Sequence, residues 1–171
     1  MEGTIRLGEH TLPVRGEGWM DREWGTSALE PEHQGWDWFS VQLADGRELM
    51  YFELRREDGL SDPHDYGVLV DVDGGYRTFE GDQAELTVLN WWRSPVDGSR
   101  YPSGWRLEVR EAGLDLELEP RLRNQEMDLS FRYWEGAVSV RGRGPEGTVE
   151  GRGYVELTGY GGGEAARGTA P

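Results

Sequence analysis

Cysteine is absent from the 171-residue chain, which excludes disulfides, thiolate nucleophiles and cysteine-ligated metals. Histidine is scarce: His10, His33 and His64 are far apart and lack the spacing of a metal site. The sequence also lacks a Gly-x-Ser-x-Gly elbow, and its glycines form no phosphate-binding motif ahead of a helix. We therefore expect neither a metal nor a cofactor.

Basic residues are also few. The chain has 18 Lys and Arg against 33 Asp and Glu, a formal net charge of -15. This balance argues against binding to nucleic acid or to an anionic membrane surface, since both need basic patches. No apolar run approaches the roughly 18 residues that would span a bilayer, and no signal peptide opens the chain. We expect a cytoplasmic protein with no membrane insertion.

Glycine and large aromatic residues, by contrast, are abundant, with 26 Gly, 8 Trp and 7 Tyr. Turn glycines between short aromatic and β-branched runs, at roughly ten-residue spacing, are typical of an all-β chain. We predict a single antiparallel β-barrel of about 8–10 strands over residues 1–160, with a disordered tail at 161–171. The tryptophans either fill the core or line an apolar or sugar-binding cavity.

The stretch from Gly18 to Gly25 holds two carboxylates between two tryptophans. We predict a long strand over residues 12–24, which would place Trp19, Asp21 and Glu23 on one face. The Cα atoms of the two acids would lie about 6.6 Å apart, at about 3.3 Å per residue. In a dry pocket one pKa would rise, giving a neutral acid beside an ionised base. Alternatively, one or both carboxylates pair with Arg22, Arg55 or Arg132 and only hold the barrel together.

Two other segments could complete such a site. The strand over residues 35–43 carries Trp36 and Trp38 on one face and Phe39 on the other, so both faces look buried. We infer that one face lines a cavity and that the other packs beneath another element. Tyr133 and Glu135 share a strand face and could form a hydrogen-bonded network around the acid pair, or could be surface groups.

Seven motifs occur in an order that resembles a known family. They are Gly18-Trp-Met-Asp-Arg-Glu-Trp-Gly25, Gly35-Trp-Asp-Trp-Phe39, Leu49-Met50 with Arg55, Ser94-Pro95 followed by Tyr101-Pro-Ser-Gly-Trp105, Asn124-Gln-Glu126, Tyr133-Trp-Glu-Gly-Ala137, and Gly153-Tyr-Val-Glu-Leu-Thr-Gly-Tyr160. Over about residues 3–160 the chain resembles the carboxy-terminal lipocalin-like domain of the carotenoid hydratase (hydroxyneurosporene synthase) and AttH-like family.

The resemblance implies a lipocalin-like barrel and chemistry on apolar, polyunsaturated ligands. In that family two such barrels pack together, and carotenoid hydratases add water across an isoprenoid double bond by acid catalysis without a cofactor. Relatives hydrate a prenyl group of a plant phytoalexin or close rings on polyenes, including Diels–Alder-type cyclisations. The sequence contains one barrel and has Arg22 where the family usually has His. We therefore expect a homodimer, in which a second copy replaces the other barrel.

Our leading hypothesis is a cofactor-free enzyme for natural-product biosynthesis. It would hydrate or cyclise an apolar isoprenoid, polyene or polyketide in the barrel. Asp21 or Glu23 would donate the proton, and Tyr133 and Glu135 would orient the donor or a water. The expected substrate contacts are Trp19, Trp36, Trp38, Tyr51, Arg55, Trp105, Glu126, Trp134 and Tyr154. The alternatives are a non-catalytic binding protein for a hydrophobic ligand and, third, a sugar-processing enzyme with paired carboxylates.

Overall fold

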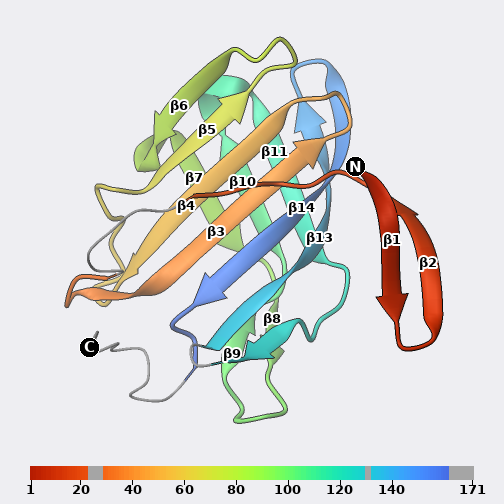
Figure 1. The fold of residues 1–171 in the computed structure, drawn as a ribbon. Helices are drawn as coiled ribbons and strands as arrows, with labels where there is room; N and C mark the ends of the chain where they lie inside the picture. The colour runs from red at the N-terminus through yellow and green to blue at the C-terminus, as the bar shows by residue number, and fades with distance from the viewer. Residues whose placement is uncertain (23–28, 130–131, 162–171) are drawn as a thin grey trace.

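The computed structural model describes residues 1–22, 29–129 and 132–161. Nine antiparallel strands form one curved sheet in the order β6-β5-β4-β3-β14-β13-β11-β10-β7, and β12 pairs with β13. The sheet curls into a nearly closed barrel (Figure 1), with the 3₁₀-helix η1 (Gly81–Gln83) joining the edge strands β6 and β7. The predicted single lipocalin-like barrel is confirmed.

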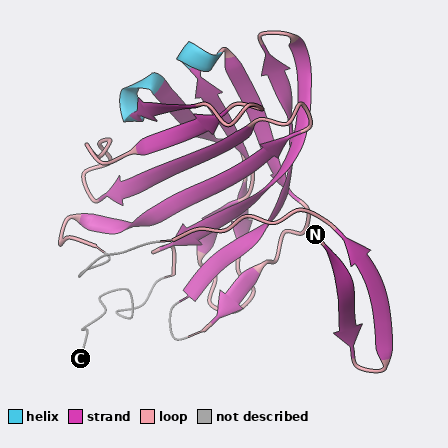
Figure 2. Ribbon diagram, turned by 45° about the horizontal axis from the view of Figure 1, so that its top comes forward, coloured by secondary structure: helices cyan, strands magenta, loops and turns pink. Residues whose placement is uncertain are grey.

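The regular secondary structure of the described residues is β-strand, apart from η1 and a second 3₁₀-helix, η2 (Arg110–Ala112) (Figure 2). The strands are β1 (Glu2–Leu7), β2 (His10–Arg15), β3 (His33–Leu43), β4 (Glu48–Arg56), β5 (Tyr66–Val70), β6 (Tyr76–Glu80), β7 (Ala84–Val88), β8 (Trp91–Arg93), β9 (Arg100–Pro102), β10 (Trp105–Val109), β11 (Leu114–Pro120), β12 (Glu126–Asp128), β13 (Arg132–Gly144) and β14 (Gly147–Thr158). Among the residues described, no helix has the length and apolar character needed to cross a membrane.

The predicted long strand over residues 12–24 is wrong for its described part. Strand β2 ends at Arg15, and residues 16–22 are not strand. Gly16 and Gly18 interrupt the pattern, because glycine weakens a strand interior. The backbone N–H of Gly16 donates to the carbonyl of Met1 and closes the β1–β2 hairpin at 3.0 Å. The shared face expected for Trp19 and Asp21 therefore does not form, and Glu23 lies outside the described residues.

The barrel interior is filled with apolar side chains. The fully buried ones are Phe39, Val41, Leu49, Trp105, Leu107, Leu116, Leu118, Trp134, Val138, Val155 and Leu157. The predicted hairpin near residues 105–119 is present as β10 and β11, joined by η2, with buried and half-buried residues alternating along both strands. Because side chains pack the middle of the barrel, polar groups that face inward gather at its end. Residues 162–171, which make up nearly all of the predicted tail, lie outside the described part.

Candidate functional site

Two carboxyl groups face each other inside the barrel, where β3 begins and β4 ends. Asp37 of β3 and Glu53 of β4 are direct partners in the antiparallel ladder. Side chains opposed in this way have Cβ atoms about 4.5–5.5 Å apart. Asp37 is only 2% exposed, and Glu53 is half-buried. The fold thus brings two carboxyl groups together in a site that is largely shielded from water.

Strand alternation places this pair on the inner face. Phe39 and Val41 follow Asp37 at every second position of β3, and both are fully buried. On β4, the buried Tyr51 precedes Glu53 by two residues. The core-facing rows of both strands therefore change from apolar to acidic near the end of the barrel.

Asp37 is held by two donors. The Nε of Arg55 lies 2.8 Å from its Oδ1, and the hydroxyl of Tyr160 donates to its Oδ2 at 2.8 Å. The Arg55 guanidinium also lies 3.7 Å from the centre of the Tyr160 ring and donates to the carbonyl oxygen of Thr158. Burial raises the pKa of Asp37, and Arg55 and Tyr160 offset only part of that rise.

Tyr160 reaches this site because the chain turns after β14. Gly159 has a φ of 73°, in the left-handed region that favours glycine. A Cβ at this position would collide with the carbonyl oxygen of Gln34. The turn therefore needs glycine, and it carries the Tyr160 ring over Arg55 and beside Asp37.

Glu53 differs from its partner in having no donor. It makes no hydrogen bond or ion pair with the part of the chain that the structure describes. Burial, reinforced by the negative charges of Asp37 and Asp65, raises the pKa of Glu53 to about 7, although Arg55 lowers it in part. A large fraction of Glu53 is therefore a neutral carboxylic acid at neutral pH, as a general acid requires.

A second polar cluster adjoins the first through two tyrosine rings. The rings of Tyr101 and Tyr160 have centroids 5.7 Å apart. The Tyr101 hydroxyl donates to Oε1 of Glu126 at 3.0 Å, and the Ser94 hydroxyl donates to its Oε2 at 2.5 Å. Arg132 lies 3.7 Å from the same carboxylate. Of the expected substrate contacts, Glu126 therefore lies in this cluster, while Tyr51 and Arg55 lie in the first one.

Trp105 and Trp134, two other expected contacts, are core residues. Their ring centroids lie 6.0 Å apart, and Trp105 also packs against Phe39 at 5.7 Å. The indole N–H of Trp134 donates to the carbonyl of Arg123 at 2.9 Å. The indole N–H of Trp105 is buried and has no partner among the described residues.

The remaining expected residues lie on the outer side of the barrel or on the segment before it. Trp36 and Trp38 alternate with the inward-facing Asp37 and Phe39, so they do not line the lumen. Trp19 packs edge-on against Trp38 with centroids 6.2 Å apart, and Trp36 packs against Tyr133 at 6.3 Å.

Three further residues of the expected site also lie outside the barrel lumen. Glu135 is paired with Glu156 in the β13–β14 ladder, and Tyr154 is exposed on β14. Asp21, the expected proton donor, is exposed. The expected residues thus fall into an inner group and an outer group, separated by the sheet.

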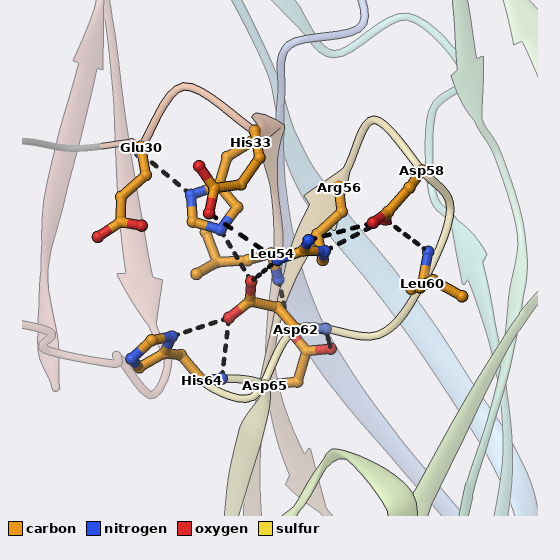
Figure 3. A network of polar contacts seen from close by, with 10 residues as sticks. Glu30, His33, Leu54, Arg56, Asp58, Leu60, Asp62, His64 and Asp65 are labelled. Atoms are coloured by element: carbon orange, nitrogen blue, oxygen red, sulfur yellow. Dashed lines mark hydrogen bonds and ion pairs between the residues drawn. The ribbon is translucent and has the colours of Figure 1, made fainter.

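A network of polar contacts fixes the β4–β5 loop at the same end of the barrel (Figure 3). The buried carboxylate of Asp62 accepts from His33 Nε2 at 2.8 Å, from the ring of His64 at 2.8 Å and from the backbone N–H of His64 at 2.9 Å. The Nδ1 of His33 accepts the backbone N–H of Glu30 at 3.1 Å. Because both ring nitrogens of His33 are engaged, it acts as a structural anchor and not as a base.

Asp65 connects this network to the site. Its carboxylate accepts the backbone N–H groups of Leu54 at 2.7 Å and of Asp62 at 2.9 Å. Its negative charge also contributes to the raised pKa of Glu53. Within the described ranges, no group of three or more His, Asp and Glu side chains is arranged to hold a metal ion.

Sequence reasoning missed Asp37, Glu53 and Tyr160 as site residues, although a signal for the first two was present. A turn at Asp45-Gly46 fixes the register of the following hairpin, and that register pairs residue 37 with residue 53. Two acids directly opposed in otherwise apolar rows indicate a buried carboxyl pair. Tyr160 carried no comparable signal, because its position depends on the turn at Gly159.

The comparisons with known proteins agree on one family. A family model described as AttH-like matches residues 1–160. A kievitone hydratase from Fusarium solani subsp. phaseoli is 24% identical over an aligned length of 157 residues. The match covers 85% of this chain and 41% of that protein.

Two solved structures share the fold. One, assigned as an AttH from Nitrosomonas europaea, has a TM-score of 0.83 and 36% identity and covers 93% of this chain and 49% of its own. The other, a kievitone hydratase from Nectria haematococca, has a TM-score of 0.75 and 18% identity and covers 92% of this chain and 49% of its own. The chain thus spans about half the length of these relatives. It belongs to the AttH-like family.

Proposed function

We propose that this barrel carries the acid–base centre of a cofactor-free enzyme that adds a proton to a C=C bond of an apolar small molecule. The observation that carries the proposal is Glu53, a carboxyl group inside the barrel with no hydrogen-bond donor among the described residues and a pKa of about 7. Similarity to two kievitone hydratases supports hydration as the type of addition.

In the proposed step, the O–H bond of Glu53 breaks and its proton forms a new C–H bond with the π electrons of the alkene. The cation left on the other carbon lies near the Asp37 carboxylate, whose negative charge favours it. A water oxygen then attacks the cation, and the proton that it loses returns to the Glu53 carboxylate. Attack by a second C=C bond of the same molecule, followed by loss of a proton, would instead close a ring.

Asp37, Arg55 and Tyr160 act as positioning residues in this scheme. The ion pair and the tyrosine hydroxyl fix one negative group beside the acid, which raises the pKa of Glu53. Asp21 is the competing donor from the sequence, but it is exposed. We therefore assign the proton transfer to Glu53.

The test is an isotope-labelling assay of the whole chain with kievitone and with acyclic prenylated phenols, in water enriched in oxygen-18. Glu53→Gln should lower product formation by roughly 10²–10⁴-fold, the range for removal of a general acid. Glu48→Gln, on the outer face of the same strand, should keep wild-type activity.

Three results would overturn this assignment. The first is full activity of Glu53→Gln. The second is a loss of activity in Asp21→Asn while Glu53→Gln stays active, and the third is a Glu53 carboxyl that titrates near its ordinary pKa in carbon-13 NMR. Quenching of tryptophan fluorescence by these compounds without turnover would favour a binding protein over an enzyme.

A further inference from the structure

The β1–β2 hairpin, residues 2–15, forms an arm that projects away from the barrel (Figures 1 and 2). Its register places the large apolar side chains on one side, since Ile5 pairs with Leu12 and Gly3 pairs with Val14. Every strand residue of the arm is exposed. Four large apolar side chains on its apolar side have exposed fractions of 39% to 60%, and they are Ile5, Leu7, Leu12 and Val14.

An exposed arm of this kind is expected to be only marginally stable in an isolated monomer. An isolated two-stranded hairpin is marginally stable in water and needs a further surface against its apolar side. A contiguous row of exposed apolar side chains on such an element marks an interaction site. The arm therefore indicates a partner surface of similar length that is also apolar.

The same chain presents such a surface. We define the outer face as the aromatic side chains that point away from the lumen on β3, β4, β5 and β14, namely Trp36, Trp38, Phe52, Tyr66 and Tyr154. Tyr66 and Tyr154 are 45% and 41% exposed, and the other three are half-buried. The segment that joins the arm to the barrel already lies on this face, because Trp19 packs on Trp38.

We propose that the arm of one copy lies on the outer face of a second copy, in a symmetric dimer that exchanges arms. Such a contact is self-complementary, because each chain supplies one arm and one face.

Charge also favours the arm as the contacting element. The whole chain has a net charge of -15, whereas the arm balances Glu2 and Glu9 with Arg6 and Arg15. The arm can therefore approach a second acidic copy with little repulsion. Arg6 and Arg15 lie on the side of the arm opposite its apolar row, where Arg6 pairs with Thr11 and Arg15 with Glu2, so these arginines are not on the contacting side.

Sedimentation of the full chain tests the dimer. The wild type should be dimeric at micromolar concentration, and Ile5→Glu with Leu12→Glu should raise the dissociation constant about 100-fold or more. Thr4→Glu with Thr11→Glu changes the opposite side of the same arm and should leave the dimer intact. Far-UV circular dichroism checks that each variant keeps the barrel.

Cross-linking tests which surface the arm contacts. The chain has no native cysteine, so a cross-linker reacts only with the cysteines that are introduced. A mixture of Leu12→Cys and Tyr154→Cys chains, treated with a short bismaleimide, should give a mixed dimer that joins the two peptides. A mixture of Thr11→Cys and Tyr154→Cys should give much less. A monomeric wild type, a dimer that tolerates the Ile5→Glu and Leu12→Glu changes, or equal cross-linking in both mixtures would overturn the proposal.

Discussion

Glu53 makes the stability of the native state depend on pH. The pKa of this carboxyl is about 7 in the folded chain, against an ordinary value of 4.5. Between these two values the folded state binds more protons than the unfolded state, so stability falls as the pH rises. At one pKa unit per about 1.4 kcal/mol, the loss across this range is about 3 kcal/mol.

Glu53→Gln should remove the part of this dependence that comes from Glu53, because the amide does not titrate. We expect its free energy of unfolding in urea to change much less between pH 4.5 and pH 7 than that of the wild type. Glu48→Gln is the matched control and should keep the wild-type slope. Identical slopes for the wild type and Glu53→Gln would contradict a buried, neutral Glu53.

The residues of the site show how far sequence reasoning reaches at this scale. The need for a pair of carboxylates in a dry environment was derived from chemistry, and Asp37 and Glu53 provide one. Their identity depended on which face of β3 turns inward, and the tryptophans on either side of Asp37 drew attention to the wrong face. A tryptophan is large enough to be half-buried on an outer face, so its presence does not identify the lumen.

At the scale of elements, the β4–β5 loop depends on Asp62. Burial alone would raise the pKa of this carboxyl, but hydrogen bonds from His33, His64 and Arg56 hold it well below its usual range. The stability that these bonds contribute is present above an ordinary aspartate pKa of 3.8 and is lost only when the pH falls far below it.

Asp62→Asn should therefore destabilise the chain by about 2–4 kcal/mol, since it removes a buried charge that several donors share. Hydrogen exchange should show faster exchange at the backbone N–H groups of His64 and Asp65. Asp58→Asn breaks an exposed ion pair with Arg56 in the same loop and should cost less than about 1 kcal/mol. Equal losses in the two variants would show that Asp62 is not the anchor.

The turn after β14 gives a second prediction for an element. Gly159→Ala should cost about 2–4 kcal/mol, because the left-handed φ of 73° disfavours a side chain and its Cβ would meet Gln34. The same change should displace Tyr160 and so alter the pKa of Glu53 in an NMR titration. Gly16→Ala, with nothing within 4 Å of an added Cβ, is the control for stability. A neutral effect of Gly159→Ala would mean that the turn is not strained.

Strands could be predicted from the sequence where one face of the strand is buried and the other is exposed to solvent. The β10–β11 hairpin was identified because Trp105, Leu107 and Val109 alternate with charged residues. The β2 strand was extended too far, because the alternation continues through Gly16 and Gly18 while the backbone does not. The alternation of apolar and polar residues indicates which face of a strand is apolar. It does not indicate where the backbone hydrogen bonds of the strand end.

For the whole molecule, the charge of -15 sets how the proposed dimer responds to salt. Two copies repel each other at low ionic strength, and salt screens that repulsion over a Debye length of about 10 Å at 0.1 M. We expect the dissociation constant to fall about tenfold between 50 and 500 mM sodium chloride, measured by sedimentation. Weaker association at high salt would indicate an interface held by ion pairs instead of apolar contact.

The nearly closed sheet has one further consequence. Across the described strands the backbone ladder runs without interruption from β6 round to β7, while η1 alone bridges those two edges. Widening the barrel anywhere else would break a row of backbone hydrogen bonds, whereas parting β6 from β7 would break none. This seam is therefore the place where the barrel can open at the least cost in backbone hydrogen bonds.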